Sequence, residues 1–267
     1  MELSVESWSQ AIASRVSRRS FRTDPPEEGL LERLERVCRE FRPFPEARVV
    51  LVREPVGEVA AGIIGGYGRV SGAPCYLAFI GRMDSARVQE CVGYNTGEAL
   101  ILEATSLGLS TCWVGGLFKP GVVSALLGIG ESEKVLCISP VGYPAARPSL
   151  TDRTFKALAG SARRKSLEEL VEEGRIPESG VKTAIAAARL SPSANNRQPW
   201  RFRADGQTVT ILTDNDKKEW KISRRLDCGI AMLHFELGAR AAGLVGEWEF
   251  REAPEVARYV LSVTSFS

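Results

Sequence analysis

The sequence predicts an α+β fold in which a central, mainly antiparallel sheet is flanked by helices and the chain consists of two related halves. Several segments carry apolar residues at the spacing of a helix face, and short apolar runs between them are typical of buried strands. One spacing of residues also occurs twice, which indicates a duplicated unit. The 267 residues suffice for one large domain or two small ones.

Helices are expected over residues 5–18, 30–41 and 96–107 of the first half. The first two segments place apolar side chains along one helix face. The third is apolar, and Gly108 directly after it is a candidate helix C-cap, because glycine readily adopts the left-handed conformation that ends many helices. These segments form the helical part of the first half.

Strands are expected at residues 48–53, 75–81 and 135–141, where apolar residues follow one another without the helical period. Gly142-Tyr143-Pro144 closes the last of these strands. The charged segment 150–180 that follows is expected to be a linker that crosses between the halves.

The second half is shorter and contains the same kinds of element. A helix is expected at 181–190, a strand hairpin turned at Asp205-Gly206, and a further helix at 229–242. We therefore divide the chain into residues 1–160 and residues 161–267.

The repeated spacing lies at the ends of the apolar helices. Ala104-x-x-x-Gly108-Leu109-x-x-x-Trp113 in the first half is matched by Ala239-x-x-x-Gly243-Leu244-x-x-x-Trp248 in the second. Four identities at fixed offsets in the same context favour duplication. Such a chain would correspond to a symmetric dimer, with its sites between the subunits, whose two subunits are fused into one polypeptide.

Composition excludes several classes of protein. A net charge of +2 argues against a nucleic-acid partner, which requires a clearly basic face. The sequence contains no run of about eighteen apolar residues and no signal-peptide pattern, so neither a membrane span nor secretion is expected. The six cysteines are scattered, which is typical of buried thiols in a reducing compartment, and we expect a cytoplasmic protein.

The chain has one histidine, His234, within an apolar pattern. A metal site built on several imidazoles is therefore impossible, and we expect no metal. A Ser-His-Asp hydrolase would have to use His234, which is better explained as a packed helix residue. If the chain is an enzyme, a cofactor is expected to perform the difficult step.

Residues 191–200, Ser-Pro-Ser-Ala-Asn-Asn-Arg-Gln-Pro-Trp, are the most informative segment. Pro192 and Pro199 restrict the backbone on both sides of the segment, so the loop should be stiff. A stiff loop that presents hydroxyl and amide groups suits the edge of a planar, hydrogen-bonding ring. The plainer alternative is an asparagine-rich turn between a helix and a strand.

Two further segments suggest ligand contacts. Arg18, Arg19, Ser20 and Arg22 form a cluster that could grip a phosphate, although a basic helix end would also explain it. Trp113-Val114-Gly115-Gly116 follows the apolar helix, and paired glycines allow backbone amides to approach a flat ligand. A simple glycine turn is the alternative.

Two other motifs are less specific. Arg163-Arg164-Lys165 reads by itself as a solvated basic run. The glycine-rich segment 62–72 invites a dinucleotide-loop interpretation, but it runs into a strand instead of opening a helix. A cover over the ligand is a better hypothesis for it.

Segment 191–200 resembles the flavin-contacting loop of the nitroreductase family, Ser-Pro-Ser-x-x-Asn-x-Gln-Pro-Trp. Arg18-Arg19-Ser20-Phe21-Arg22 is similar to the Arg-x-Ser-x-Arg or Lys segment near the start of that family. The order of the two motifs differs from that of ordinary nitroreductases. There the loop comes soon after the arginine segment, whereas here it lies in the second half of the chain. The chain thus resembles the fused, pseudo-dimeric, thermotogal-type branch of the family, and its implied fold is the FMN-dependent nitroreductase fold.

The resemblance implies a role for each matching residue. Arg18 and Ser20 would hold the phosphate of FMN with Arg19 beside them, and Arg22 would face the pyrimidine end of the flavin. Arg164 would be a second phosphate contact, but Ala162 stands where the family usually has a lysine. The remaining implied contacts are the backbone of Gly115 and Gly116 near flavin N5, and Pro192, Ser193, Ala194 and Asn196 at the ring edge.

The implied activity is hydride transfer from NAD(P)H through flavin N5 to a small electron-poor acceptor such as a nitroaromatic or quinone. One FMN per chain would lie between the halves, in a monomeric pseudo-dimer or a further homo-oligomer. Two alternatives remain open. The chain could be a flavin-binding or degenerate, non-catalytic scaffold, or it could consume flavin as a substrate or reduce a halogenated aromatic.

Overall fold

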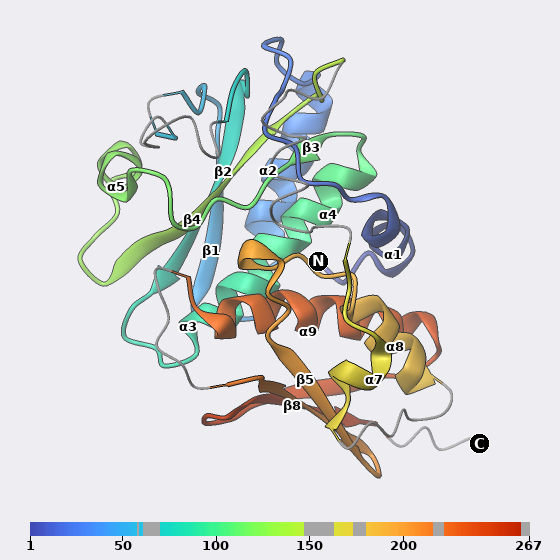
Figure 1. Ribbon diagram of the computed structural model, residues 1–267. Coiled ribbons are helices and arrows are strands. Elements are labelled where there is room, and N and C mark those ends of the chain that lie inside the picture. Colours follow the sequence, from blue (N-terminus) through green and yellow to red (C-terminus); the bar gives the residue numbers. More distant parts are fainter. Residues whose placement is uncertain (58, 61–69, 147–162, 173–179, 216–221, 263–267) are drawn as a thin grey trace.

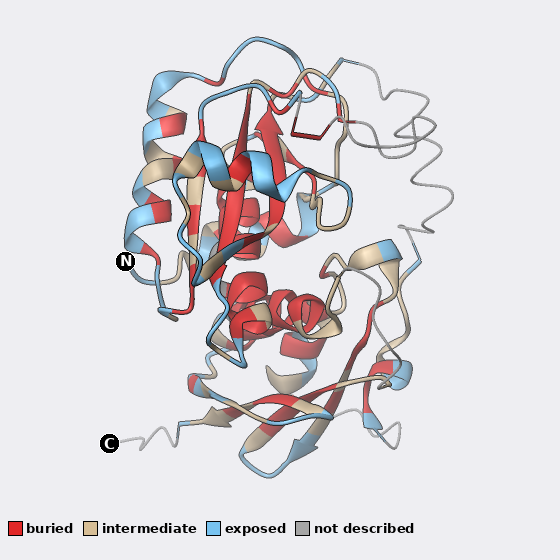
Figure 2. Ribbon diagram, turned by 90° about the vertical axis from the view of Figure 1, so that its left-hand side faces the viewer, coloured by how far each residue is buried: buried red, intermediate tan, exposed pale blue. Residues whose placement is uncertain are grey.

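The computed structural model describes residues 1–57, 59–60, 70–146, 163–172, 180–215 and 222–262. Two sheets lie on opposite sides of a layer of helices (Figure 1). Figure 2 shows that this helical layer contains many of the buried residues. Among the described residues, no helix combines the length and the apolar character that a membrane span requires.

The first half begins with two helices and continues with a sheet into which further helices are inserted. Its helices are α1 (Val5–Ser14), α2 (Glu28–Glu40), α3 (Val88–Cys91), the π-helical η2 (Val92–Glu98), α4 (Ala99–Ser106) and α5 (Pro120–Leu127). Its strands are β1 (Ala47–Val52), β2 (Cys75–Arg82), β3 (Ser110–Thr111) and β4 (Glu133–Gly142).

The second half repeats the arrangement with fewer elements. Its helices are α7 (Leu167–Leu170), α8 (Gly180–Ala188), the 3₁₀ turn η4 (Ala194–Asn196) and α9 (Arg224–Ala241). Its strands are β5 (Trp200–Asp205), β6 (Thr208–Thr213), β7 (Gly246–Phe250) and β8 (Glu255–Leu261). The expected linker contains α7, which begins with a capping box formed by Ser166 and Glu169.

The two sheets have the same topology. Each has four antiparallel strands, in the orders β1-β2-β4-β3 and β5-β6-β8-β7, and in each a helical run connects the second strand to the third. The α+β class and the antiparallel pairing are confirmed. In place of the expected single central sheet there are two sheets, one in each half. Each sheet packs one face against the helices that lie between the two sheets (Figure 1).

The repeated spacing marks equivalent helix ends. The amide of Leu109 donates to the carbonyl of Ala104, and the amide of Leu244 donates to the carbonyl of Ala239, both over 2.9 Å. Gly108 and Gly243 adopt φ values of 76° and 78° in these caps. Both α4 and α9 therefore end in a left-handed glycine cap, as expected for Gly108.

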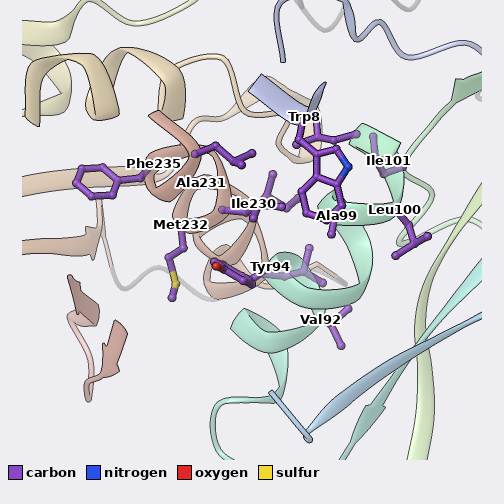
Figure 3. Packing of buried hydrophobic residues seen from close by; sticks show 14 of the residues in the cluster. Trp8, Val92, Tyr94, Ala99, Leu100, Ile101, Ile230, Ala231, Met232 and Phe235 are labelled. Atoms are coloured by element: carbon purple, nitrogen blue, oxygen red, sulfur yellow. The ribbon is translucent and has the colours of Figure 1, made fainter. Parts of the chain in front are cut away.

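The helices of the two halves meet at two glycines. A Cβ atom on Gly93 would lie 2.2 Å from the carbonyl oxygen of Leu226, and one on Gly229 would lie 2.2 Å from that of Glu90. The backbones of α3 and η2 thus touch the backbone of α9. Figure 3 shows side chains of both helices in one core, including Tyr94 and Ile230.

All six cysteines are buried and carry reduced thiols, as the sequence predicts. Cys38 is an example, because burial raises the pKa of its thiol to about 12. Such thiols behave as small apolar side chains of the core.

We predict that Gly229→Ala lowers the free energy of unfolding by about 1–3 kcal/mol, because the new methyl group must push apart two helix backbones. The urea midpoint of the variant measures this change. Gly29→Ala in α2 is the matched control, since a Cβ there meets no atom within 4 Å. Equal midpoints for Gly229→Ala and the wild type would contradict the tight crossing.

Candidate functional site

A cavity of about 490 Å³ lies between the halves. One wall is the segment that follows β3, the opposite wall is the loop before β5, and the start of α9 forms the base. The residues that line it are Ser17, Arg19, Cys112, Trp113, Val114, Gly115, Gly116, Leu117, Cys137, Pro192, Ser193, Ala194, Asn195, Arg197, Ile222, Leu226, Asp227 and Ile230. Six of the residues predicted from the sequence are among them, namely Arg19, Gly115, Gly116, Pro192, Ser193 and Ala194.

The glycine wall is held against strand β4. Val114 exchanges two backbone hydrogen bonds with Ile138, over 2.9 and 3.0 Å. At the next residue, a Cβ atom on Gly115 would come within 3.1 Å of the Cys137 sulfur and of the Ile222 side chain. A side chain at Gly115 would therefore crowd the cavity, whereas glycine leaves the backbone accessible.

The loop of the opposite wall is tied to Asp227 of α9. The amide of Ala194 donates to both carboxylate oxygens of Asp227, over 3.2 and 3.3 Å, and Arg197 Nε donates to Oδ2 over 2.7 Å. Within the loop, the hydroxyl of Ser193 accepts a hydrogen bond from the amide of Gln198. These bonds, together with the prolines, fix the loop in the stiff form that the sequence predicts.

The loop backbone also contains three left-handed residues. Asn195, Asn196 and Gln198 have φ values of 52°, 53° and 49°. Asparagine tolerates this conformation better than most residues, which explains the Asn-Asn pair locally. The Gln198 side chain is buried and accepts the amide hydrogen of Lys165, so the left-handed turn is held by a second segment.

The segment after α1 brings only part of its predicted cluster to the cavity. Arg19 lines the cavity, whereas Arg18 and Ser20 are not among the lining residues. The backbone amide of Arg18 donates to the carbonyl of Thr111 in β3. The guanidinium of Arg22 is half exposed, pairs with Asp24 through two hydrogen bonds and stacks on a tyrosine ring. Arg22 is thus engaged at the surface.

Arg164 lies in a group of guanidinium groups that the sequence only partly predicts. Its Nη1 donates to the side-chain oxygen of Asn196 and its Nη2 to the carbonyl of Leu190. Burial, followed by repulsion from Arg15 and Arg189, lowers the pKa of Arg164 to about 10. Arg15 and Arg189 therefore lie close enough to Arg164 to repel its charge.

Arg15 extends this group toward the cavity. Its side chain is 7% exposed, and its Nη1 lies 3.3 Å from the hydroxyl of Ser17, which lines the cavity. Its Nε makes no hydrogen bond to the described part of the chain and lies 3.8 Å from Glu98. The guanidinium of Arg15 thus forms an ion pair with a buried carboxylate and contacts a residue of the cavity wall.

Sequence reasoning missed Asp227, Arg15 and Arg189. Asp227 is 2% exposed and is an acidic residue within an apolar stretch of α9, a signal that could have identified it. Arg15 and Arg189 stand near helix ends, where basic residues are common, so their sequence positions carry little signal. Ala162 and most of the glycine-rich segment, residues 62–69, lie outside the described residues.

Comparison with known proteins gives consistent results. A family model described as "Putative TM nitroreductase" matches residues 8–239. The fold is similar to the crystal structure of a "putative nitroreductase" from Thermotoga maritima, with 21% identity and a TM-score of 0.62 over 95% of this chain and 93% of that chain.

Two other proteins are more weakly similar. The "Putative NAD(P)H nitroreductase acg" of Mycobacterium tuberculosis is 30% identical over 88 residues, which are 31% of this chain and 27% of that protein. The match thus spans about a quarter of that curated relative. An "FMN-dependent Nitroreductase" of Clostridium difficile R20291 has 16% identity and a TM-score of 0.44, over 54% of this chain and 92% of that chain.

We predict that Asp227→Asn lowers the free energy of unfolding by about 2 kcal/mol, because Arg197 loses its buried carboxylate and the Ala194 amide keeps only a neutral acceptor. Hydrogen exchange at the Ala194 amide should become faster. The control is Asp24→Asn, which removes the half-exposed partner of Arg22 and should leave the urea midpoint unchanged. Unchanged exchange at Ala194 would show that Asp227 does not hold the loop.

Proposed function

The chain belongs to this nitroreductase family, and on that premise we propose that it is an FMN-dependent oxidoreductase with NAD(P)H as electron donor. The acceptor would be a small electron-poor molecule such as a nitroaromatic or a quinone. When bound, FMN supplies a ring that takes up hydride at N5 and passes it on. The observation that carries the proposal is the cavity between a glycine wall and the Ser-Pro-Ser loop, with Arg19 in its lining and with Arg15 and Arg164 bonded to Ser17 and Asn196 beside it.

The arginine end fits the phosphate of FMN. A phosphate monoester carries between one and two negative charges at neutral pH, and guanidinium groups bind its oxygens in pairs. Arg15, Arg19 and Arg164 are the residues we propose to hold it, with Arg18 and Ser20 next to Arg19. Burial, followed by repulsion from Arg15 and Arg189, lowers the pKa of Arg164, and this repulsion indicates that positive charge is concentrated here.

The middle of the cavity fits a planar ring. Gly115 and Gly116 expose backbone on one side, and a backbone N–H of this pair is our candidate for the contact near N5. Pro192, Ser193 and Ala194 line the other side and would meet the ring edge. Asn196 would act indirectly, because its side chain holds Arg164. Arg22 could reach a flavin only by releasing Asp24.

The two halves would then share one FMN per chain. Residues 1–160 supply the glycine wall and the first arginines, and residues 161–267 supply the loop and Arg164. The proposed reaction requires no acid or base from the protein, since solvent or flavin can supply protons. The reduced thiols suit a cytoplasmic enzyme.

The test of this function is the visible absorbance spectrum of the protein with FMN, before and after addition of NADH or NADPH without oxygen. We expect bound flavin that loses its yellow absorbance with at least one of the two nucleotides. Bound flavin that neither nucleotide reduces would favour the non-catalytic, flavin-binding alternative. A protein that binds no FMN would reject the proposed function and favour the degenerate scaffold.

The phosphate contact has a separate test in the Arg164→Ala variant. We expect the Kd for FMN to rise about tenfold or more, the factor that corresponds to one charge-assisted hydrogen bond, while the Kd for riboflavin stays unchanged. Fluorescence titration with both flavins measures this. Arg53→Ala is the control, because Arg53 pairs with Glu28 and Glu35 on the surface. Equal weakening of FMN and riboflavin would indicate a distorted loop and contradict the phosphate contact.

A further inference from the structure

The cavity-lining Trp113 is held by a buried carboxylate that also reaches the second half. Its indole N–H donates to Glu98 Oε2 over 2.9 Å. The other oxygen, Glu98 Oε1, lies 2.9 Å from Nε2 of His234 on α9. Glu98 and His234 are both fully buried. A chain of two contacts thus connects α9 to the wall of the cavity.

The Trp113 ring is also fixed by shape. A Cβ atom on Gly97 would lie 1.9 Å from Cη2 of Trp113, so the ring occupies the space that the missing side chain leaves. The ring packs on Phe79 with centroids 4.8 Å apart. Packing therefore restricts the ring on two sides, and the bond to Glu98 fixes its rotation.

His234 is placed so that both of its ring nitrogens face oxygen atoms. Nδ1 lies 3.3 Å from the carbonyl oxygen of Ala187 on α8, and Nε2 faces Glu98. A neutral imidazole carries only one N–H. The carbonyl of Ala187 can only accept, so Nδ1 must carry a proton. A hydrogen bond between Nε2 and Glu98 then needs a second proton, either on Nε2 or on the carboxyl group. The pair is then a complete link between α8, α9 and η2.

We propose that His234 and Glu98 are positioning residues that set the orientation of Trp113, so that the second half determines the shape of the first half's cavity wall. The consequence for a ligand rests on the proposed function, in which this wall faces FMN. The role of His234 would then be to orient Trp113 through Glu98, which is neither simple core packing nor catalysis.

A second network across the same interface supplies a matched control. Glu236 of α9 accepts hydrogen bonds from the indole N–H of Trp248, over 3.0 Å, and from the hydroxyl of Tyr94 on η2. Trp248 is the counterpart of Trp113 in the repeated spacing, but it does not line the cavity. Tyr94→Phe therefore removes a comparable bond between the halves without removing a bond to Trp113 or Glu98.

The experiment compares His234→Leu, His234→Gln and Tyr94→Phe by two measurements. The first is the Trp113 indole signal in a ¹H–¹⁵N correlation spectrum of the flavin-free protein, assigned among the five tryptophans by Trp113→Phe. The second is the Kd for FMN. His234→Leu should shift the indole signal and raise the Kd about fivefold, the loss expected for about one hydrogen bond.

His234→Gln should restore most of both properties, because its amide can donate to Glu98 from the position of Nε2. Tyr94→Phe should leave both unchanged. The proposal is wrong if His234→Leu changes neither property, or if Tyr94→Phe changes both as much as His234→Leu does. If His234→Leu does not fold, Glu98→Gln takes its place, since loss of the carboxylate must shift the same indole signal.

The two proposals fail separately in this design. A wild-type protein that binds no FMN would reject the proposed cofactor, while the indole signal would still test the positioning of Trp113. Conversely, normal FMN binding with an indole signal that does not respond to His234→Leu or to Glu98→Gln would reject only the positioning role.

Discussion

The close crossing of the central helices is the constraint on which the rest of the structure depends. At Gly93 and Gly229 the backbones of α3 and η2 approach that of α9 so closely that a single methyl group would overlap a carbonyl oxygen. Each helix belongs to one half and packs against that half's sheet. The distance between these backbones therefore sets the distance between the sheets, and with it the width of the cavity whose base includes Leu226 and Ile230 of α9.

Buried charge fixes the register of that crossing. Glu90, Glu98 and Glu236 are all buried in the shared core, and each pairs with a residue of the other half. A buried carboxylate that lost its partner would be strongly unfavourable. A slide of one helix along the other would break all of these pairs together, whereas apolar packing would tolerate small shifts more easily. The polar contacts therefore select one arrangement of the two halves among those that would bury similar apolar area.

The same packing concentrates positive charge around Arg164. The end of α1, the segment before α7 and the end of α8 meet there, and they carry Arg15, Arg164 and Arg189. At the loop, the carboxylate of Asp227 pairs with Arg197. Among the described residues, the one ion pair made by Arg15, Arg164 and Arg189 is that of Arg15 with Glu98. A cluster of arginines next to the cavity-lining Ser17 and a loop tied to Asp227 thus arise from one packing arrangement.

The sequence by itself determined the features that depend on neighbouring residues. Helical spacing, short apolar runs, the glycine cap at Gly108 and the Asp205-Gly206 turn all follow from local preferences, and the repeat followed from comparing two local patterns. The loop at 191–200 and the pair Gly115-Gly116 were recognisable because their motifs are contiguous. Only the tertiary structure decided that the sheets are two, that Arg22 pairs with Asp24, that Asp227 lines the cavity, and that Arg15 contacts Ser17 of its wall. The physical reason is that hydrogen bonds and ion pairs between distant residues, such as Glu98 and His234, form only once packing has brought their helices together, and no local period records them.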